Sequence, residues 1–222
     1  ISTVLKSLLD LKNIKEKDPS TKALAYQLYE NNGVIKREQV SEYLDKLDQN
    51  ERKILRNLGV KFGRYHVFLY KLIKPDAVSL RTLLWKNYHQ KYYDLRPPTF
   101  GLNFLDNKDF KNKNFMLLCG FEKFDNFFVR IDILERLFIQ ILNSNNDKKN
   151  EKMIKMVPEM INLLGCSKEN FKKLISMMNY KIFEKDKDIF FKYNPTKKNK
   201  KFFVKKTNKE SPFKILKNLN LN

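Results

Sequence analysis

The spacing of apolar residues divides the first hundred positions into short amphipathic helices. Apolar residues recur at helical intervals in residues 1–9, 23–29, 36–47 and 49–58. Gly33 and Gly59 stand just beyond the second and the fourth of these segments. Glycine commonly follows the last turn of a helix, so both positions are expected helix ends.

The pattern changes character in residues 60–73, which read VKFGRYHVFLYKLI and are rich in β-branched and aromatic side chains. Pro75 suits the first turn of a helix, where its missing N–H removes no hydrogen bond. We expect this helix to reach about residue 90 and to bury Leu80, Leu83 and Leu84.

A polar run over residues 106–114 looks like a connecting loop and gives a soft domain boundary. Beyond it, apolar residues predict strands at 116–121 and 127–129. A helix follows, whose apolar face is formed by Ile131, Leu134, Leu137, Phe138, Ile141 and Leu142.

Residues 157–191 complete a recognisable order of elements. A short helix ends at Gly165, and Ser167 is well suited to cap the next helix. That next helix has an apolar face made of Phe171, Leu174, Ile175 and Met178. Two apolar strands around a charged tip then predict a hairpin, so the series helix, helix, turn, helix, hairpin is typical of a winged helix-turn-helix.

The predicted fold is therefore mostly α, of the α+β class. We expect a helical accessory subdomain over residues 1–105 and a winged-helix-like subdomain over residues 115–195. Residues 196–222 form a basic tail and closing segment, and no internal repeat is apparent along the chain.

Charge adds a preference for polyanionic partners. The formal net charge is +20, and residues 146–222 contribute +12 of it with 20 lysines against 8 acidic residues. Lysines that neutralise phosphates release condensed counterions, which favours nucleic-acid binding. A coding bias toward AT-rich codons, visible in the 24 asparagines, explains the lysine content equally well.

Candidate catalytic chemistry is sparse. The chain contains no G-x-x-x-x-G-K-[ST] loop to hold phosphates, so we expect neither catalytic residues nor a cofactor here, and enzyme status stays open. His66 and His89 lack nearby metal-ligating partners, and Cys119 and Cys166 do not have metal-site spacing, so no metal is expected. Cys166 precedes a predicted helix, where a thiol pKa can fall, but a small apolar residue filling the turn is the favoured interpretation.

The compartment expected from the sequence is the cytoplasm. No stretch approaches the 18 apolar residues of a membrane span, and two cysteines do not make a disulfide framework. The sequence begins at Ile1 without methionine, and we interpret it as part of a longer protein.

Lysines on the last predicted helix and its hairpin are the candidate binding residues. Lys168, Lys172 and Lys173 fall away from the apolar face of the helix, and Lys185 and Lys187 lie at the hairpin tip. They are expected to meet phosphates rather than to read bases, because lysine acts mainly as a point charge. The alternative is a solvated lysine face on a winged helix that binds protein.

The most distinctive segment of the sequence is LRNLGVKFGRYHVFLYKLIKPDAVSLRTLLW, residues 55–85. It resembles a block in the C-terminal region of bacterial relatives of the mitochondrial degradosome RNA helicase, a superfamily 2 family. Four further segments are similar to blocks of the same family in the same order: KALAYQLYENNGVIKREQV, FVRIDILERL, INLLGCSKENFKKLISMMNY and SPFKIL.

The resemblance implies an accessory region of an ATP-dependent RNA or DNA helicase. ATP and Mg²⁺ would belong only to motor domains outside this chain, which would act in cis with it. Within the specific block, Lys61, Arg64, Lys74 and Arg81 match basic positions and become candidate nucleic-acid contacts. For Arg64, pairing with an acidic residue of the fold is an equal alternative. A scaffold that docks a nuclease or ribosomal partner to the helicase is the alternative, and a free-standing transcriptional regulator is a third and less favoured one.

Overall fold

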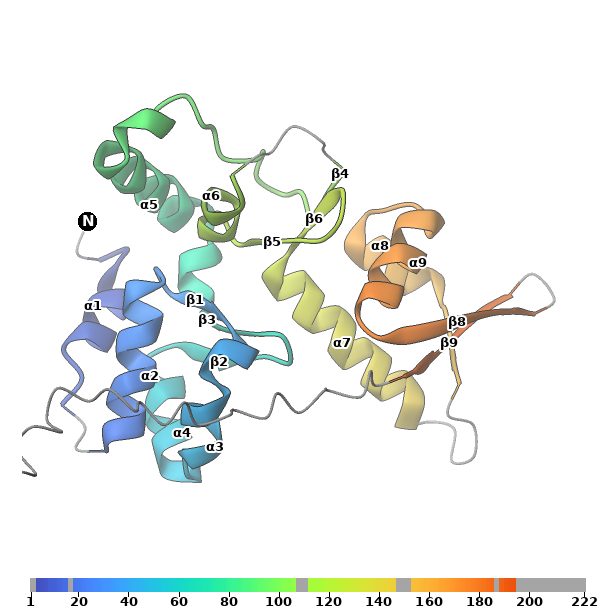
Figure 1. Cartoon of the computed structure of the whole chain (residues 1–222), viewed down its shortest axis with the longest axis horizontal. Coiled ribbons are helices and arrows are strands. Elements are labelled where there is room, and N and C mark those ends of the chain that lie inside the picture. The colour runs from blue at the N-terminus through green and yellow to red at the C-terminus, as the bar shows by residue number, and fades with distance from the viewer. Residues whose placement is uncertain (1–2, 16–17, 107–111, 147–152, 186–187, 195–222) are drawn as a thin grey trace, which may run out of the picture.

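Three small antiparallel sheets, each accompanied by helices, follow one another along the chain (Figure 1). The computed structural model describes residues 3–15, 18–106, 112–146, 153–185 and 188–194. Within this part the chain mixes helices with short strands, which agrees with the expected α+β composition at that coarse level. The tail and closing segment expected after residue 195 lie outside the described residues.

The first unit, residues 19–73, follows a short helix α1 (Lys6–Lys12). Asp18 accepts a hydrogen bond from the Thr21 N–H at 2.6 Å and so caps the first helix of the unit. Its elements are α2 (Pro19–Glu30), β1 (Val34–Lys36), η1 (Arg37–Val40), α3 (Ser41–Lys46), α4 (Gln49–Asn57), β2 (Val60–Phe62), β3 (His66–Leu69) and η2 (Tyr70–Ile73).

The second unit, residues 75–130, begins with a long helix that has proline at its first position, as expected. Its elements are α5 (Pro75–Tyr88), η3 (Gln90–Tyr92), β4 (Phe104–Asp106), α6 (Lys113–Leu118), β5 (Phe121–Lys123) and β6 (Phe127–Arg130). Strand β4 pairs with β6 across the position where the sequence predicts a domain boundary, and the division itself stays a prediction.

The third unit, residues 131–193, contains the elements predicted for the C-terminal part together with one extra short strand. Gly165 ends α8 in the left-handed conformation, and the Ser167 hydroxyl accepts from the Asn170 N–H at 3.2 Å to cap α9. The elements are α7 (Ile131–Asn146), β7 (Ile154–Lys155), α8 (Pro158–Leu164), α9 (Lys168–Met177), β8 (Tyr180–Lys185) and β9 (Asp188–Tyr193).

All three units share one sheet topology, so the chain does contain an internal repeat. In each sheet the third strand lies between the first and the second, giving the orders β1-β3-β2, β4-β6-β5 and β7-β9-β8. The residue before each second strand has a positive φ: Gly59 at 94°, Gly120 at 86° and Asn179 at 66°.

The three units also share a pattern of apolar side chains around these positive-φ residues. In each unit an apolar side chain stands five, four and one positions before the positive-φ residue and one position after it. These side chains are Ile54, Leu55, Leu58 and Val60 around Gly59, Phe115, Met116, Cys119 and Phe121 around Gly120, and Leu174, Ile175, Met178 and Tyr180 around Asn179.

The strand predicted at residues 116–121 is wrong for most of its length. Residues 113–118 form α6, capped by the Asn112 side chain, which accepts from the Phe115 N–H at 2.9 Å. Phe115, Met116 and Cys119 lie on one helical face and are buried there. A short apolar run fits helix and strand periodicity alike, and the cap decides between them here.

Of the three leucines that α5 was predicted to bury, Leu83 and Leu84 are exposed instead. Leu83 and Leu84 are 54% and 42% exposed, whereas Ala77, Val78, Arg81 and Thr82 are buried. Leu80 is partly buried and packs against the core of the first unit, whereas Leu83 and Leu84 are largely exposed.

Candidate nucleic-acid interface

The tip of the β2–β3 hairpin is held against α7 by one carboxylate. Glu135 accepts hydrogen bonds from the backbone N–H groups of Arg64, Tyr65 and His66 at 2.5, 2.9 and 2.9 Å. Successive backbone N–H groups that converge in this way form a favourable site for a negative charge. The contact joins the first unit to the third and fixes where the Arg64 side chain leaves the hairpin.

Gly63 makes this contact sterically possible. A Cβ atom at this position would overlap the Glu135 carboxylate. The Gly63 carbonyl also accepts from the Arg37 guanidinium at 3.0 Å. The hairpin tip thus has side-chain contacts on both sides and is fixed in position.

A buried ionic group continues inward from the hairpin. The His66 ring, 2% exposed, lies 2.9 Å from a Glu122 carboxylate oxygen through Nε2, and Lys36 Nζ lies 2.8 Å from the other oxygen. Burial alone would lower the pKa of His66, but hydrogen bonds and charge from Glu122 and Glu135 outweigh it and raise that pKa. Burial alone would likewise raise the pKa of Glu122, and His66 with Lys36 lower it instead.

This group predicts a pH-dependent stability. Because the folded-state pKa of His66 is raised above 6.5, its contribution is complete below pH 6.5 and is lost as pH rises through the folded pKa. The unfolding free energy of wild type minus that of His66→Gln should therefore shrink between pH 6 and pH 9, by about 1.4 kcal/mol for each unit of pKa shift. Urea denaturation across this range measures the difference, and a constant difference would contradict the assignment.

A cleft of about 590 Å³ opens between the β2–β3 hairpin and α7. Its lining is rich in cations, namely Arg37, Lys61, Arg64, Arg130 and Arg136. Two of them are engaged by the protein: Arg130 donates to both Asp132 oxygens at 2.7 and 3.1 Å, and Arg37 donates to Gly63.

Three of the cations in this cleft are open to an external anion. Lys61, Arg64 and Arg136 are exposed, and none forms an ion pair with any residue that the structure describes. The sequence predicted Lys61 and Arg64 as contacts but missed Arg136, which it places only within an ordinary helix. The β2–β3 hairpin contacts α7 through the hydrogen bond between Arg64 and Glu135, which are 71 residues apart in the sequence. This contact brings the three cations together.

A second cleft, of about 460 Å³, lies between the same hairpin tip, α7 and the β8–β9 hairpin. Arg64 and Phe138 line both clefts, and the Arg64 guanidinium lies over the Phe138 ring at 5.8 Å from its centre. Arg64 also lies 3.5 Å from the Tyr193 hydroxyl, and Lys192 completes the basic lining. We call these two clefts, which share Arg64 and Phe138 in their linings, the α7 groove; Figure 1 shows α7 between the β2–β3 and β8–β9 hairpins.

The predicted lysines of α9 form a separate basic surface. Lys168 and Lys173 are exposed, whereas Lys172 pairs with Glu184 of β8 at 2.6 Å. Lys185 is exposed near the end of β8. Lys187 lies outside the described residues.

The two remaining candidates from the specific block differ sharply. Lys74 is exposed, and its ammonium lies 4.7 Å from the centre of the Tyr70 ring and 3.1 Å from its hydroxyl. Arg81 is only 3% exposed and donates to the backbone carbonyls of Asn32 and Leu118, so it is a structural residue and not a phosphate contact in this structure. Burial lowers the pKa of Arg81 to about 10, which leaves it protonated at neutral pH.

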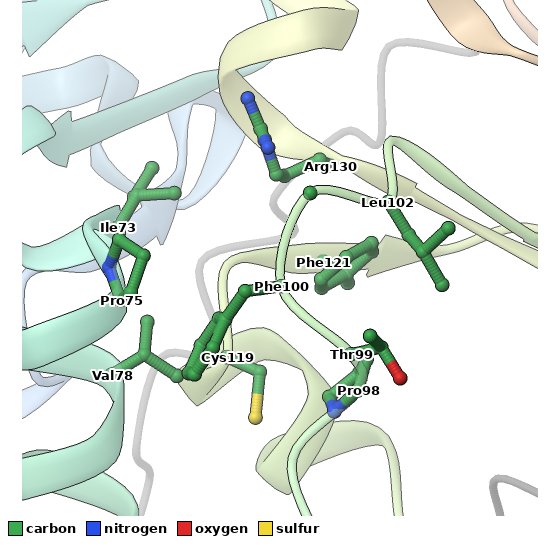
Figure 2. A pocket seen from close by; sticks show the side chains of 11 residues that line it. Ile73, Pro75, Val78, Pro98, Thr99, Phe100, Leu102, Cys119, Phe121 and Arg130 are labelled. Atoms are coloured by element: carbon green, nitrogen blue, oxygen red, sulfur yellow. The ribbon is translucent and has the colours of Figure 1, made fainter.

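A small enclosed pocket of about 50 Å³ lies between α5, the loop at residues 98–102 and β5. Its walls are mainly apolar, and Figure 2 shows the Arg130 side chain extending away from Cys119. Burial raises the pKa of the Cys119 thiol to about 12, so the thiol is protonated at neutral pH. The pocket therefore holds no activated nucleophile.

The described part of the chain likewise shows no activated thiol at Cys166 and no metal site. Burial raises the pKa of Cys166 to about 11, which opposes the lowering expected at a helix N-terminus. Among the residues that the structure describes, no three His, Cys, Asp or Glu side chains gather as a metal site. In the same residues, no helix is both long and apolar enough to cross a membrane.

No protein-family model, curated protein or solved structure matches this chain.

Proposed function

We propose that this chain is a nucleic-acid-binding accessory region that works beside an ATP-driven helicase motor. The observation that supports binding is a set of exposed cations without acidic partners among the described residues. They lie on two surfaces, the α7 groove with Lys61, Arg64 and Arg136, and α9 with Lys168 and Lys173. Cations placed in this way neutralise phosphates and release counterions.

The repeated unit supports the same proposal. In each unit a helix precedes a three-stranded sheet whose last two strands form a hairpin. We propose that the three units are winged-helix-like modules, a design that places a helix or a hairpin against nucleic acid. In the third unit, α9 takes the place of the recognition helix.

The helicase part of the proposal rests on the resemblance of residues 55–85. Phosphate-binding and metal-binding motifs of a motor are missing from the sequence, so the motor would act in cis from outside these residues. The RNA or DNA strand would pass from that motor to this region.

A salt titration tests the binding proposal. Fluorescence anisotropy with single-stranded and duplex probes of about 12 nucleotides should show affinity falling steeply with salt, because each phosphate contact adds roughly 0.7 to 0.9 to the log–log slope. Two paired variants, Arg64→Gln with Arg136→Gln and Lys168→Gln with Lys173→Gln, should together reduce that slope. Lys22→Gln with Lys46→Gln is the matched control, because both lysines are exposed on α2 and α3 away from these surfaces. Absence of binding, or affinity indifferent to salt, contradicts the proposal.

A docking role is the second candidate, and α5 favours it. Leu83, Leu84 and Tyr88 are 54%, 42% and 84% exposed on this helix. Exposed apolar side chains that gather on one element mark protein interaction sites. A nuclease, a ribosomal protein or the motor itself would cover this face, and polar substitutions there should weaken that association while leaving nucleic-acid affinity unchanged.

A further inference from the structure

We propose that the α7 groove binds a single strand of nucleic acid, with Tyr70 and Tyr193 as base-stacking positions and Lys61, Arg64 and Arg136 as phosphate contacts. This inference rests on the proposed function, and it names the form of nucleic acid that this groove selects.

The charge of the groove favours a polyanion along its whole length. Both of its acidic side chains are satisfied internally: Asp132 pairs with Arg130, and Glu135 accepts three hydrogen bonds from the hairpin backbone. The exposed cations are therefore not cancelled by neighbouring carboxylates. Arg64 lines both clefts, so it can contact a chain that occupies either of them.

Each of the two clefts has one exposed tyrosine in its lining that the other cleft lacks. Tyr70 lines only the first cleft and is 39% exposed, and Tyr193 lines only the second and is 44% exposed. Lys74 lies beside the Tyr70 ring and Arg64 beside the Tyr193 hydroxyl, so each ring has a cation next to it. A stacking ring beside a cation matches one nucleotide, with its flat base and its charged phosphate.

This combination fits a single strand better than a duplex. In a duplex the bases stack on one another, and their faces are hidden from protein side chains. A single strand exposes those faces, and aromatic side chains in a basic groove hold them with little dependence on sequence. Duplex recognition instead inserts a protruding helix or ribbon into a DNA groove. The α7 groove is concave, so it receives a strand.

The experiment uses the full chain and three labelled probes: oligo-dT and oligo-rU of about 12 nucleotides, and a duplex of the same length. Anisotropy titrations give affinity and its salt dependence for each probe. We expect both single strands to bind more tightly than the duplex. The ratio of the dT and rU affinities tells whether DNA or RNA is preferred.

Tyrosine variants separate stacking from charge. Tyr70→Ala and Tyr193→Ala should each weaken single-strand binding roughly tenfold at an unchanged salt slope, since no charge is removed. Tyr70→Phe and Tyr193→Phe should retain affinity, because the ring is kept. Tyr88→Ala, at a tyrosine that is 84% exposed on α5, is the matched control and should behave as wild type. Arg64→Gln with Arg136→Gln should lower both the affinity and the salt slope.

Each result decides between the proposals. Equal or tighter binding of the duplex by the Lys168→Gln with Lys173→Gln chain, or wild-type single-strand affinity in both tyrosine-to-alanine variants, overturns the groove as a single-strand path. If salt-dependent binding remains in those cases, nucleic-acid binding itself stands. If the wild-type chain binds none of the three probes, both proposals are wrong, and an acidic protein partner becomes the better occupant.

Discussion

Replacing Glu135 with alanine should lower the free energy of unfolding by about 3 to 5 kcal/mol, measured by urea denaturation. Its carboxylate is the acceptor for three backbone N–H groups at the β2–β3 tip, and the side chain is largely buried. Removing it leaves those donors without a partner, at a cost of about 1 to 3 kcal/mol for each buried group. Glu135→Gln keeps one acceptor oxygen, so its loss should be intermediate. Arg136→Ala, at the exposed neighbouring position, should stay within about 0.5 kcal/mol of wild type.

A substitution at Gly63 tests the same contact between the hairpin tip and Glu135. Its φ is not positive, so alanine suits the backbone, and the obstacle to Gly63→Ala is overlap with the Glu135 carboxylate. Gly63→Ala should therefore destabilise the wild-type protein strongly and the Glu135→Ala protein much less. A double-mutant cycle gives this coupling directly. Simple additivity of the two losses would show that the hairpin tip does not depend on this carboxylate.

The sequence predicted the elements whose signals are local. The third unit was predicted helix by helix, because α8 ends at a glycine, α9 begins at a serine cap, and its apolar residues keep one helical spacing. The β8–β9 hairpin was predicted for the same reason, as two apolar runs around a charged tip. Strands β1, β4 and β7 were missed, since each has only two or three residues and pairs with a strand more than 20 positions away.

The groove required information that no local pattern carries. Lys61 and Arg64 were predicted as nucleic-acid contacts because they lie in a distinctive sequence block. No sequence pattern marks Arg136 as a contact, and only the position of α7 beside the hairpin does so. The repeat was also hidden, because its units share apolar spacing and a positive-φ residue and not extended sequence identity. Several residues of the distinctive block act between units: Gly63 faces Glu135, His66 faces Glu122, and Arg81 reaches Asn32. Much of what makes this block distinctive in sequence therefore serves the packing of the units against one another.

Helix α5 shows how an amphipathic pattern can predict the wrong buried residues. The sequence predicted that Leu83 and Leu84 are buried, and the resemblance made Arg81 a candidate nucleic-acid contact. The structure reverses both, because the Arg81 guanidinium meets two backbone carbonyls that need donors. One belongs to Asn32, which has a positive φ of 54° in the turn before β1, and the other to Leu118 at the end of α6. A buried arginine is tolerated where its two terminal NH2 groups donate in this way.

Arg81→Met should therefore lower the free energy of unfolding by about 3 to 5 kcal/mol. Methionine fills much of the volume but donates no hydrogen bond, so the carbonyls of Asn32 and Leu118 lose their charged donor inside the protein. Arg81→Lys keeps the charge but cannot span both carbonyls in a fixed fork, so it should recover only part of the loss. Leu84→Ala, on the exposed side of the same helix, should be nearly neutral and is the matched control.

Affinity distinguishes this structural role from a phosphate contact. Under conditions where Arg81→Met remains folded, its affinity for the single-stranded probes and its salt slope should equal those of wild type, because the guanidinium is shielded from solvent. A variant with wild-type stability and a slope reduced by roughly 0.7 to 0.9 would instead make Arg81 a phosphate ligand, as the sequence alone predicted.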